Sequence, residues 1–288
     1  MVKHILVPVD GTPSDERALA AAFDLAGLFV AHVDVLHAHP DSRENMRLIG
    51  EGFPPEMLDT MLVEAERARR DAADRARHAF DQAVAMASAE VAERRREGGG
   101  VTASWREVAG WPVAAIAAGG RFADLVLFTQ TAETPHRMAL LEAALFDTGR
   151  PLLLTSAAVD ADSHRSVAIG WDGSLPAVRA VGAAMPFLKR ATDVSILTVE
   201  EGSGRMAAAQ ATRLVEHLGW HGIDAVVRPV PRQDRTAGEA LAAAAVEARA
   251  GLLVMGGYAH SRFRELVLGG ATRHMLGTPV ACSVLMTH

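Results

Sequence analysis

The chain contains 288 residues, which suggests two compact domains because a single domain most often has about 100 to 200 residues. Its 29 basic and 35 acidic residues give a formal net charge of −6 at pH 7, which argues against a general binder of nucleic acid. With 49% hydrophobic and 22% charged residues, the composition excludes disorder, collagen and coiled coil as the main state.

The cysteine content and the lack of long apolar segments indicate the cellular location. Cys282 is the single cysteine, so the chain has no internal disulfide and no thiolate metal cluster, and it suits a reducing compartment. We expect Cys282 to be buried in the last strand, 280–286. The first ten residues are too polar for a secretory signal, and no apolar stretch reaches the ~20 residues of a membrane span. These features predict a cytoplasmic protein with no membrane and no nucleic-acid partner.

Short apolar runs alternate with alanine-rich segments along the whole chain. In the first part, the run 5–9 ends in Asp10-Gly11-Thr12, and we expect a helix to follow with Thr12 or Ser14 as its cap. Such alternation is typical of βαβ units, in which helices connect the strands of a parallel sheet. The sequence therefore predicts an α/β fold of the doubly wound, Rossmann-like kind.

Residues 56–97 are predicted to form one long helix that glycines 98–100 end. Small or apolar residues recur every three or four positions, or a multiple of that, and predict one buried stripe, consisting of Leu58, Leu62, Ala65, Ala72, Ala76, Phe80, Ala83, Ala87 and Val91. Glu66 and Arg70, like Asp71 and Arg75, have the spacing of ion pairs one helical turn apart. We interpret the arginines of the remaining face as solvated, namely Arg67, Arg69, Arg70, Arg75 and Arg77.

The 12 histidines form no recognisable metal or catalytic motif. His32, His37 and His39 alternate with apolar residues in or after a strand, without an acidic or cysteine partner, so we expect surface or strand-end histidines. The sequence also lacks a Walker lysine, a Gly-x-Ser-x-Gly motif and paired carboxylates at a recognisable spacing. We therefore assign no catalytic residue and no metal ligand.

The second part of the chain repeats the first. Val167–Ser174 echoes Ile5–Thr12 with an offset of 162 residues, and both runs close in Asp-Gly followed by Ser or Thr. We expect two domains, 1–156 and 165–288, joined by a polar linker near 159–165. Each is predicted to be a five-stranded parallel sheet, and the strands of the second domain are expected at 166–171, 194–199, 225–230, 251–256 and 280–286.

Residues 255–274 combine a strand that ends in glycines, a loop, and a second glycine pair at the start of a helix. Gly256 lets a ligand approach the backbone closely, and Gly269-Gly270 leaves the first amides of the helix unobstructed. A helix N-terminus carries about +0.5 charge and binds anions, phosphate in particular. A local excess of basic residues strengthens the prediction of a phosphate site, with Arg262, Arg264 and Arg273 against Glu265 alone.

Open α/β sheets bind ligands outside the carboxyl ends of their strands, where the strand order reverses. At that point Asp172 is expected to accept hydrogen bonds from a ribose or base, with Trp171 or Val199 near the ring. A role in a turn or a helix cap is the alternative for Asp172, because Asp-Gly after a strand is ordinary turn chemistry. His260 or His274 is a candidate phosphate contact, since these histidines flank the glycine loop.

These motifs resemble the universal stress protein family in its tandem form, in which two such domains lie in one chain. The resemblance covers both halves and implies an adenine nucleotide alpha hydrolase-like fold, with sheets that pair through their last strands, around 151–155 and 280–286. It implies that ATP or another adenine nucleotide, with Mg²⁺ as an optional companion, binds in the second domain at the following positions: Gly170, Trp171, Asp172, Val199, Met255, Gly256, Tyr258, Ala259, His260, Arg262, Gly269, Gly270, Ala271 and Thr272.

The glycine loop departs from the family pattern of Gly, two residues, Gly, nine residues, Gly, then Ser or Thr. Gly256 and Gly269 match its first and third glycines, whereas Ala259 replaces the second glycine and Gly270 the hydroxyl residue, for which Thr272 is a substitute. The equivalent stretch of the first half, 129–145, has no glycine and carries Glu133 and Glu142 where phosphates would lie. We therefore expect the first domain to bind no nucleotide triphosphate and to have a structural role.

The expected function is that of a cytoplasmic regulatory protein of the stress response that binds ATP or a related adenine nucleotide in its second domain. One alternative is an interaction module of the same fold without nucleotide affinity, whose helical surface, especially 56–97, recruits a partner or occludes a site. A protein partner or a homodimer is also possible for the chain. A weak ATP hydrolase is the third interpretation, and it lacks an evident nucleophile or base.

Overall fold

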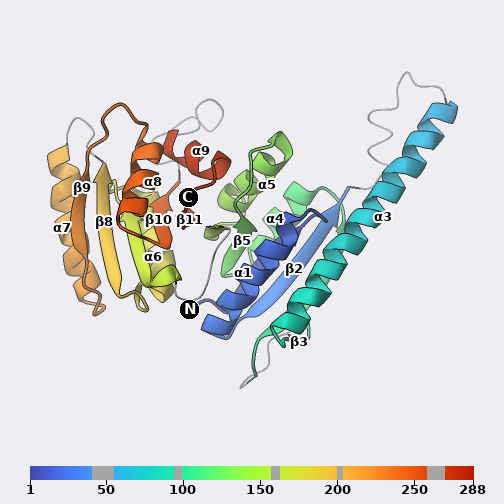
Figure 1. The fold of residues 1–288 in the computed structure, drawn as a ribbon, viewed down its shortest axis with the longest axis horizontal. Helices are drawn as coiled ribbons and strands as arrows, with labels where there is room; N and C mark the ends of the chain where they lie inside the picture. The colour runs from blue at the N-terminus through green and yellow to red at the C-terminus, as the bar shows by residue number, and fades with distance from the viewer. Residues whose placement is uncertain (41–54, 94–98, 157–162, 200–203, 258–269) are drawn as a thin grey trace. The chain divides into compact units, whose positions relative to one another are not determined.

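The computed structural model describes residues 1–40, 55–93, 99–156, 163–199, 204–257 and 270–288. These residues form two compact units. The N-terminal unit consists of Lys3–Leu127, and the C-terminal unit consists of Phe128–His288 together with Met1–Val2. Each unit is an α/β structure in which helices cover both faces of a sheet (Figure 1).

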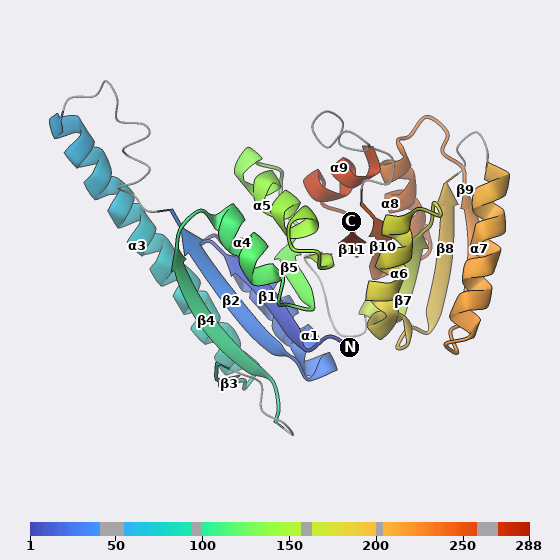
Figure 2. The same ribbon diagram turned by 180° about the vertical axis from the view of Figure 1, so that it is seen from behind.

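The N-terminal unit has a parallel sheet in the order β3-β4-β2-β1-β5. Its strands are β1 (His4–Val9), β2 (His32–His39), β3 (Glu90–Val91), β4 (Thr102–Ala109) and β5 (Leu125–Thr129), the last two residues of which belong to the C-terminal unit. Helices α1 (Ser14–Phe29) and α3 (Pro55–Met86) lie on one face of this sheet and α4 (Pro112–Gly120) on the other (Figures 1 and 2).

The C-terminal unit has a sheet in the order β6-β11-β10-β7-β8-β9, in which only the β6–β11 pair is antiparallel among the described strands. Its strands are β6 (Leu152–Thr155), β7 (Ser166–Gly170), β8 (Asp193–Val199), β9 (Val226–Val230), β10 (Leu252–Gly256) and β11 (Ser283–Thr287). The helices are α5 (Pro135–Phe146), α6 (Leu175–Leu188), α7 (Gly204–Gly219), α8 (Ala237–Glu247) and α9 (Gly270–Gly277), and a 3₁₀ turn spans Ser163–Arg165. α6 and α8 lie on opposite faces of the sheet (Figures 1 and 2).

The order of the strands confirms the predicted doubly wound α/β fold. In the second half, β9-β8-β7-β10-β11 is the order 3-2-1-4-5 in terms of chain position, with a reversal between β7 and β10. The first half repeats its first four members as β4-β2-β1-β5. The predicted strands of the second half match β7 to β10 within one residue at each end, whereas β11 begins at Ser283 and not at Val280.

The last strands of the two halves pair with each other, as expected. β6 and β11 run antiparallel, with Leu153 opposite Leu285. Gln130 reinforces this pairing, since its Nε2 donates to the Cys282 carbonyl at 2.8 Å and its Oε1 accepts from the Val280 amide at 2.7 Å. The division into compact units therefore places β6 with the second half. The domain boundaries 1–156 and 165–288, which come from the sequence repeat, stay a prediction.

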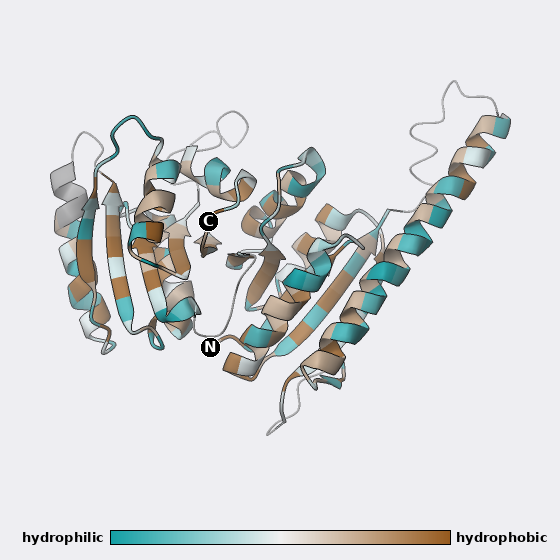
Figure 3. Ribbon diagram, viewed as in Figure 1, coloured by the Kyte–Doolittle hydropathy of each residue, from teal (hydrophilic) through white to brown (hydrophobic). Residues whose placement is uncertain are grey.

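The central strands form the buried core of each unit, whereas β3 and β9 are largely exposed. Residues 252–255 of β10 are all buried, and such unbroken apolar runs are typical of parallel strands that are covered on both faces. Figure 3 shows the same pattern as mostly brown strands. Cys282 is 2% exposed, which confirms its predicted burial, but it lies just before β11 and not in the strand. Burial raises the pKa of its thiol to about 11. The thiol is therefore protonated and unreactive near neutral pH.

Helix α3 is shorter and less buried than the sequence suggests. It ends at Met86, because Ser88 adopts a left-handed backbone with φ of 49° and reverses the chain toward β3; glycines 98–100 therefore do not end it. The centre of the predicted stripe is buried, with Ala76 and Phe80 both 0% exposed, whereas Ala65 and Val91 are exposed. Hydrophilic residues recur along the whole helix in Figure 3.

Three of the arginines predicted to be solvated contact the body of the unit: Arg69, Arg75, and Arg77, which lies over the ring of Trp105. Arg75 donates from Nε to the carbonyl of Gly11 at 2.8 Å, so the predicted ion pair with Asp71 is not formed among the described residues. Arg69 binds Glu66 at 2.9 Å and also approaches His39 and Glu107. The predicted Glu66–Arg70 pair is present at 3.0 Å.

Candidate functional site

The loop after β7 begins the site that the sequence predicts. Asp172 is exposed, and its Oδ1 accepts the amide of Ser174 at 2.9 Å across Gly173, whose φ is +76°. Ser174 Oγ in turn accepts the amide of Ala177 and caps α6, as expected. One carboxylate oxygen of Asp172 thus stabilises the turn, which was the alternative to a contact with a ribose or base. In the first half, Pro13 precedes α1 and neither Thr12 nor Ser14 caps it.

Trp171 carries an unpaired hydrogen-bond donor at the end of β7. Its backbone amide donates to the carbonyl of Leu197 in β8 at 2.9 Å. Its indole Nε1 is buried and has no acceptor among the described residues. A buried donor without a partner costs on the order of 1–3 kcal/mol, so this position favours a hydrogen-bond acceptor.

The glycines at the ends of β7 and β10 are explained by packing inside the unit. A Cβ on Gly256 would lie 2.5 Å from the amide nitrogen of Ala177, because the start of α6 approaches this backbone. A Cβ on Gly170 would lie 3.3 Å from both methyl groups of Leu241 in α8. The amide of Gly257 donates to the carbonyl of Thr287 at 2.7 Å. Close helix packing alone therefore requires glycine at position 256.

The central part of the predicted glycine loop lies outside the described residues. Five predicted site residues fall there, namely Tyr258, Ala259, His260, Arg262 and Gly269. The described chain resumes at Gly270, the first residue of α9, where a Cβ would meet nothing within 4 Å. Ala271 is half-buried and Thr272 is 3% exposed.

The remaining predicted residues lie at the same end of the sheet. Val199 is the half-buried last residue of β8 and pairs with Val230. Met255 is buried in β10 opposite Gly170. The described structure thus brings Gly170, Met255 and Val199 to the carboxyl ends of neighbouring strands, where α/β sheets bind ligands.

The corresponding loop of the first half is filled by a side chain. The carboxylate of Asp15 accepts the amides of Gly11 at 2.7 Å and Asp10 at 3.2 Å, and Asp15 is 4% exposed. Burial, followed by the negative charge of Asp10, raises the pKa of Asp15 to about 7, although the backbone hydrogen bonds oppose this shift. Ala177 stands at the equivalent position of the second half.

Helix α3 also covers this loop in the N-terminal unit. A Cβ on Gly11 would lie 2.3 Å from the carbonyl oxygen of Ala72, in a backbone with φ of +80°. Gly173 has a similar φ, but the nearest atom there is Oε1 of Gln210, at the end of a flexible side chain. A rigid helix backbone therefore closes the first loop, and a movable side chain lies over the second.

A polar cluster in the N-terminal unit was missed by the sequence analysis. Asp34 is 5% exposed in β2, and Arg106 of β4 binds both of its oxygens, at 2.9 Å from Nε and 2.6 Å from Nη2. His4 Nε2 lies 3.3 Å from Asp34 Oδ2. Burial opposes ionisation of Asp34, but the hydrogen bonds from His4 and Arg106 outweigh it and lower the pKa to about 2. The hydrogen bond to Asp34 is also the main cause that raises the pKa of His4.

The histidines of β2 are also better connected than expected. His32 contacts Thr102 Oγ1 at 2.8 Å and Ser104 Oγ at 3.0 Å, and burial lowers the pKa of its imidazole. His39 Nε2 lies 3.3 Å from the carboxylate of Glu107, so the expectation of no acidic partner was wrong. These contacts join residues of β2 to residues of β4, and the pairing of the two strands brings them together.

The strand order and the helices on both faces of the sheet define a Rossmann-like α/β protein. The sequence profile of the universal stress protein family matches residues 1–132. The first half of the chain is therefore similar to universal stress protein domains. No curated protein sequence matches the chain.

Solved structures resemble the fold over almost the whole chain. A universal stress protein from Archaeoglobus fulgidus DSM 4304 has a TM-score of 0.66 and 18% identity, and the match covers 99% of this chain and 97% of that one. A structure from Pseudomonas aeruginosa UCBPP-PA14, proposed to be a universal stress protein, has a TM-score of 0.54 and 16% identity over 99% and 93% of the two chains. These likenesses show that the second half shares the fold. No helix in the described part of the chain is long and apolar enough to cross a membrane.

Proposed function

We propose that this chain is a cytoplasmic regulatory protein of the stress response that binds ATP or a related adenine nucleotide through its second half. The ligand would lie at the carboxyl ends of β7, β8 and β10. Asp172 and Val199 would contact the ribose and the adenine, and amides in the first turn of α9, which begins at Gly270, would bind phosphate. Mg²⁺ would accompany the phosphates.

The contrast between the two β–α loops carries this proposal. In the first half, the loop amides already donate to the carboxylate of Asp15, and helix α3 packs on Gly11. In the second half, Ala177 supplies no carboxylate, Gly270 faces open space and Trp171 Nε1 has no described acceptor. This contrast between the described residues favours the second half as the place where backbone amides would hold an anion.

Nucleotide binding is tested on the full chain. Purified protein is denatured to release any bound nucleotide, which is identified by chromatography, and the melting temperature of refolded protein is followed against ATP. A ligand specific for the native state adds about 2.7 kcal/mol at 100 times its Kd. The absence of both a copurified nucleotide and a shift at millimolar ATP would remove the proposal.

A pair of equivalent variants locates the site. Asp172→Ala removes the exposed carboxylate of the second half, and Asp10→Ala is its matched control in the first. Asp172→Ala is expected to weaken ATP binding by about tenfold, the effect of one hydrogen bond to a charged group, whereas Asp10→Ala leaves the Kd unchanged. Equal effects of the two variants would contradict a site in the second half.

An interaction module without nucleotide affinity remains the second candidate, and the surface of α3 favours it. Met57 is 50% exposed and Val63 is 67% exposed near the start of this helix. If they contact a second copy, the double variant Met57→Glu/Val63→Glu lowers the mass measured by light scattering, whereas Met86→Glu at the other end of α3 does not. A monomer in all three samples would count against self-association through α3.

A further inference from the structure

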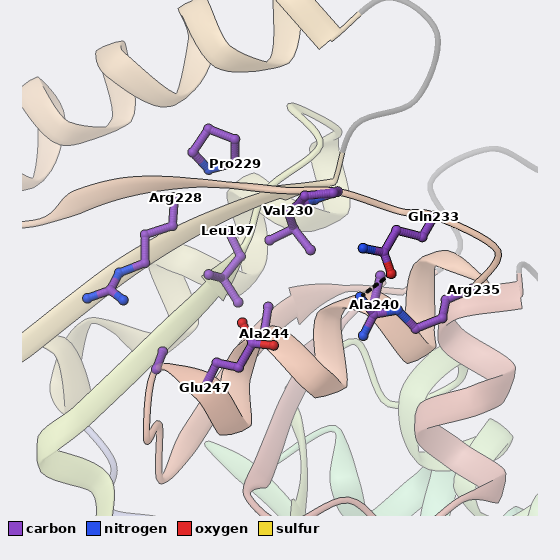
Figure 4. A pocket seen from close by; sticks show the side chains of 11 residues that line it. Leu197, Arg228, Pro229, Val230, Gln233, Arg235, Ala240, Ala244 and Glu247 are labelled. Carbon is purple, nitrogen blue, oxygen red and sulfur yellow. Dashed lines mark hydrogen bonds between the residues drawn. The ribbon is translucent and has the colours of Figure 1, made fainter.

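Two pockets occupy equivalent places in the two halves. One has a volume of about 400 Å³ and lies in the N-terminal unit between the sheet and α4. The other, of about 330 Å³, lies in the C-terminal unit between the sheet and α8 (Figure 4). Strand register relates them: Leu36 pairs with Arg106 in the first, and Leu197 pairs with Arg228 in the second. Each arginine is followed two residues later by a valine that also lines the pocket.

The helices complete the correspondence. Ala115 is the fourth residue of α4 and Ala240 is the fourth residue of α8, and both line their pockets. Gly119 and Ala244 correspond in the same way at the eighth positions. The two pockets are therefore copies of one site, produced by the repeat.

The two copies differ in the partner of the arginine. In the first, the carboxylate of Asp34 binds both Nε and Nη2 of Arg106. The register places Ser195 at the position of Asp34, since Leu6 pairs with Asp34 and the equivalent Ala168 pairs with Ser195. Arg228 is exposed and forms no ion pair with any residue of the described ranges. The second copy thus keeps the guanidinium but lacks the internal carboxylate.

We propose that the pocket between β9 and α8 binds a small organic monocarboxylate. The carboxylate of the ligand pairs with Arg228 in the same way as the carboxylate of Asp34 pairs with Arg106. Figure 4 shows Arg228, Leu197 and Val230 on the side of the strands where α8 lies. Leu197, Val230 and Ala240 form an apolar floor for the body of the ligand. A volume of about 330 Å³ is at the lower end of the range for small-molecule sites.

The charges that line the pocket favour a monoanion. Arg228 and Arg235 supply two positive charges and Glu247 one negative charge, so one positive charge remains. A dianionic phosphate would exceed this charge and would meet the carboxylate of Glu247. A planar carboxylate matches the two donors of a guanidinium, which is the geometry of Asp34 with Arg106.

The loop that borders the pocket holds an uncommon backbone conformation. Gln233 has φ of 51°, a left-handed value that non-glycine residues adopt rarely and that is frequent at ligand sites. Its Oε1 accepts from Arg235 Nη2 at 3.5 Å, and both side chains lie beside the pocket in Figure 4. The strained residue and the second arginine are thus placed together where a polar ligand end would lie.

The experiment compares benzoate with benzamide, a neutral molecule of nearly the same shape, on the isotopically labelled full chain by NMR titration. Benzoate is expected to shift the backbone amides of β9 and α8, whereas benzamide leaves them unchanged. Arg228→Gln is expected to weaken benzoate binding by about tenfold or more, because a charge-assisted bidentate contact is lost. Equal shifts by the two probes, or unchanged affinity in Arg228→Gln, would overturn the proposal.

Ser195→Asp provides a second variant that keeps the arginine. It places a carboxylate where the first copy has Asp34, so it is expected to pair with Arg228 internally and to abolish benzoate binding. Arg106→Gln is the matched control, which alters the first copy and leaves the benzoate affinity intact. Asp172→Ala also leaves it intact, so failure of nucleotide binding and failure of this proposal are distinguishable. Normal benzoate affinity in a folded Ser195→Asp protein would contradict the assigned place of the carboxylate.

Discussion

Replacement of Asp34 by asparagine tests the polar cluster of the N-terminal unit. Asparagine preserves the shape of the side chain and one acceptor, so the main loss is the negative charge that binds Arg106 and His4. The pKa of Asp34 is lowered from 3.8 to about 2, which corresponds to about 2 kcal/mol of stability when the carboxylate is ionised. Asp34 is 5% exposed, so solvent screens this interaction little.

The pH dependence gives the prediction its sign. Because the pKa of Asp34 is lower in the folded state, its contribution is present above pH 4 and is lost as the pH falls toward 2. The pKa of His4 is raised by the same pair, so its contribution is present at acidic pH and is lost as the pH rises above its ordinary value of 6.5. The stability difference between wild type and Asp34→Asn should therefore be largest near pH 5, by about 2 kcal/mol.

Urea unfolding at pH 2.5, 5 and 8, followed by tryptophan fluorescence, measures this difference. The three pH values lie below, between and above the ordinary pKa values of aspartate, about 4, and histidine, about 6.5. The matched control is Asp71→Asn, which removes an exposed carboxylate from α3 and should change the free energy of unfolding by less than about 0.5 kcal/mol. A difference for Asp34→Asn that is the same at all three pH values, or no larger than that of the control, would refute this account.

Two further predictions concern the β1–α1 loop. Because the pKa of Asp15 is raised to about 7, its ionisation destabilises the fold as the pH rises from 4 through 7. The melting temperature of wild type should therefore fall relative to that of Asp15→Asn between pH 5 and 8. A difference in melting temperature that stays constant over this range would contradict the raised pKa. Gly11→Ala should lower the free energy of unfolding by more than about 2 kcal/mol, because its Cβ would collide with Ala72. Gly149→Ala, with φ of +68° and open space around it, should lower it by about 1 kcal/mol. Equal losses for the two variants in urea unfolding would show that α3 moves to accommodate the new side chain.

The fold was largely predictable because local signals determine it. Apolar runs bounded by glycine and aspartate predict β7 to β10 within one residue, and the strand that follows Pro279 begins only slightly later than expected. The end of α3 was not predictable, since alanine spacing continues past Met86 and nothing in the sequence indicates the left-handed backbone of Ser88.

The candidate site was predictable only in part, because its contacts join distant residues. Gly256 was interpreted as a place for ligand approach, but the start of α6 at Ala177 already requires a glycine there. Asp34 and Arg106 are 72 residues apart, so their pairing becomes visible only when the register of β2 and β4 is known. The equivalent register of β8 and β9 identifies Arg228 as the counterpart of Arg106, without an ion pair among the described residues.

The antiparallel pairing of β6 with β11 has a consequence during protein synthesis. The ribosome releases Gln130 and β6 before it has made the residues that they bind, and 150 residues separate Gln130 from Val280. Leu153 of β6 pairs with Leu285, so at roughly 5–20 residues per second the strand edge of β6 waits for about 7 to 26 seconds without its partner. An exposed edge of this kind invites aggregation, so the nascent chain is a natural client for a chaperone during that interval.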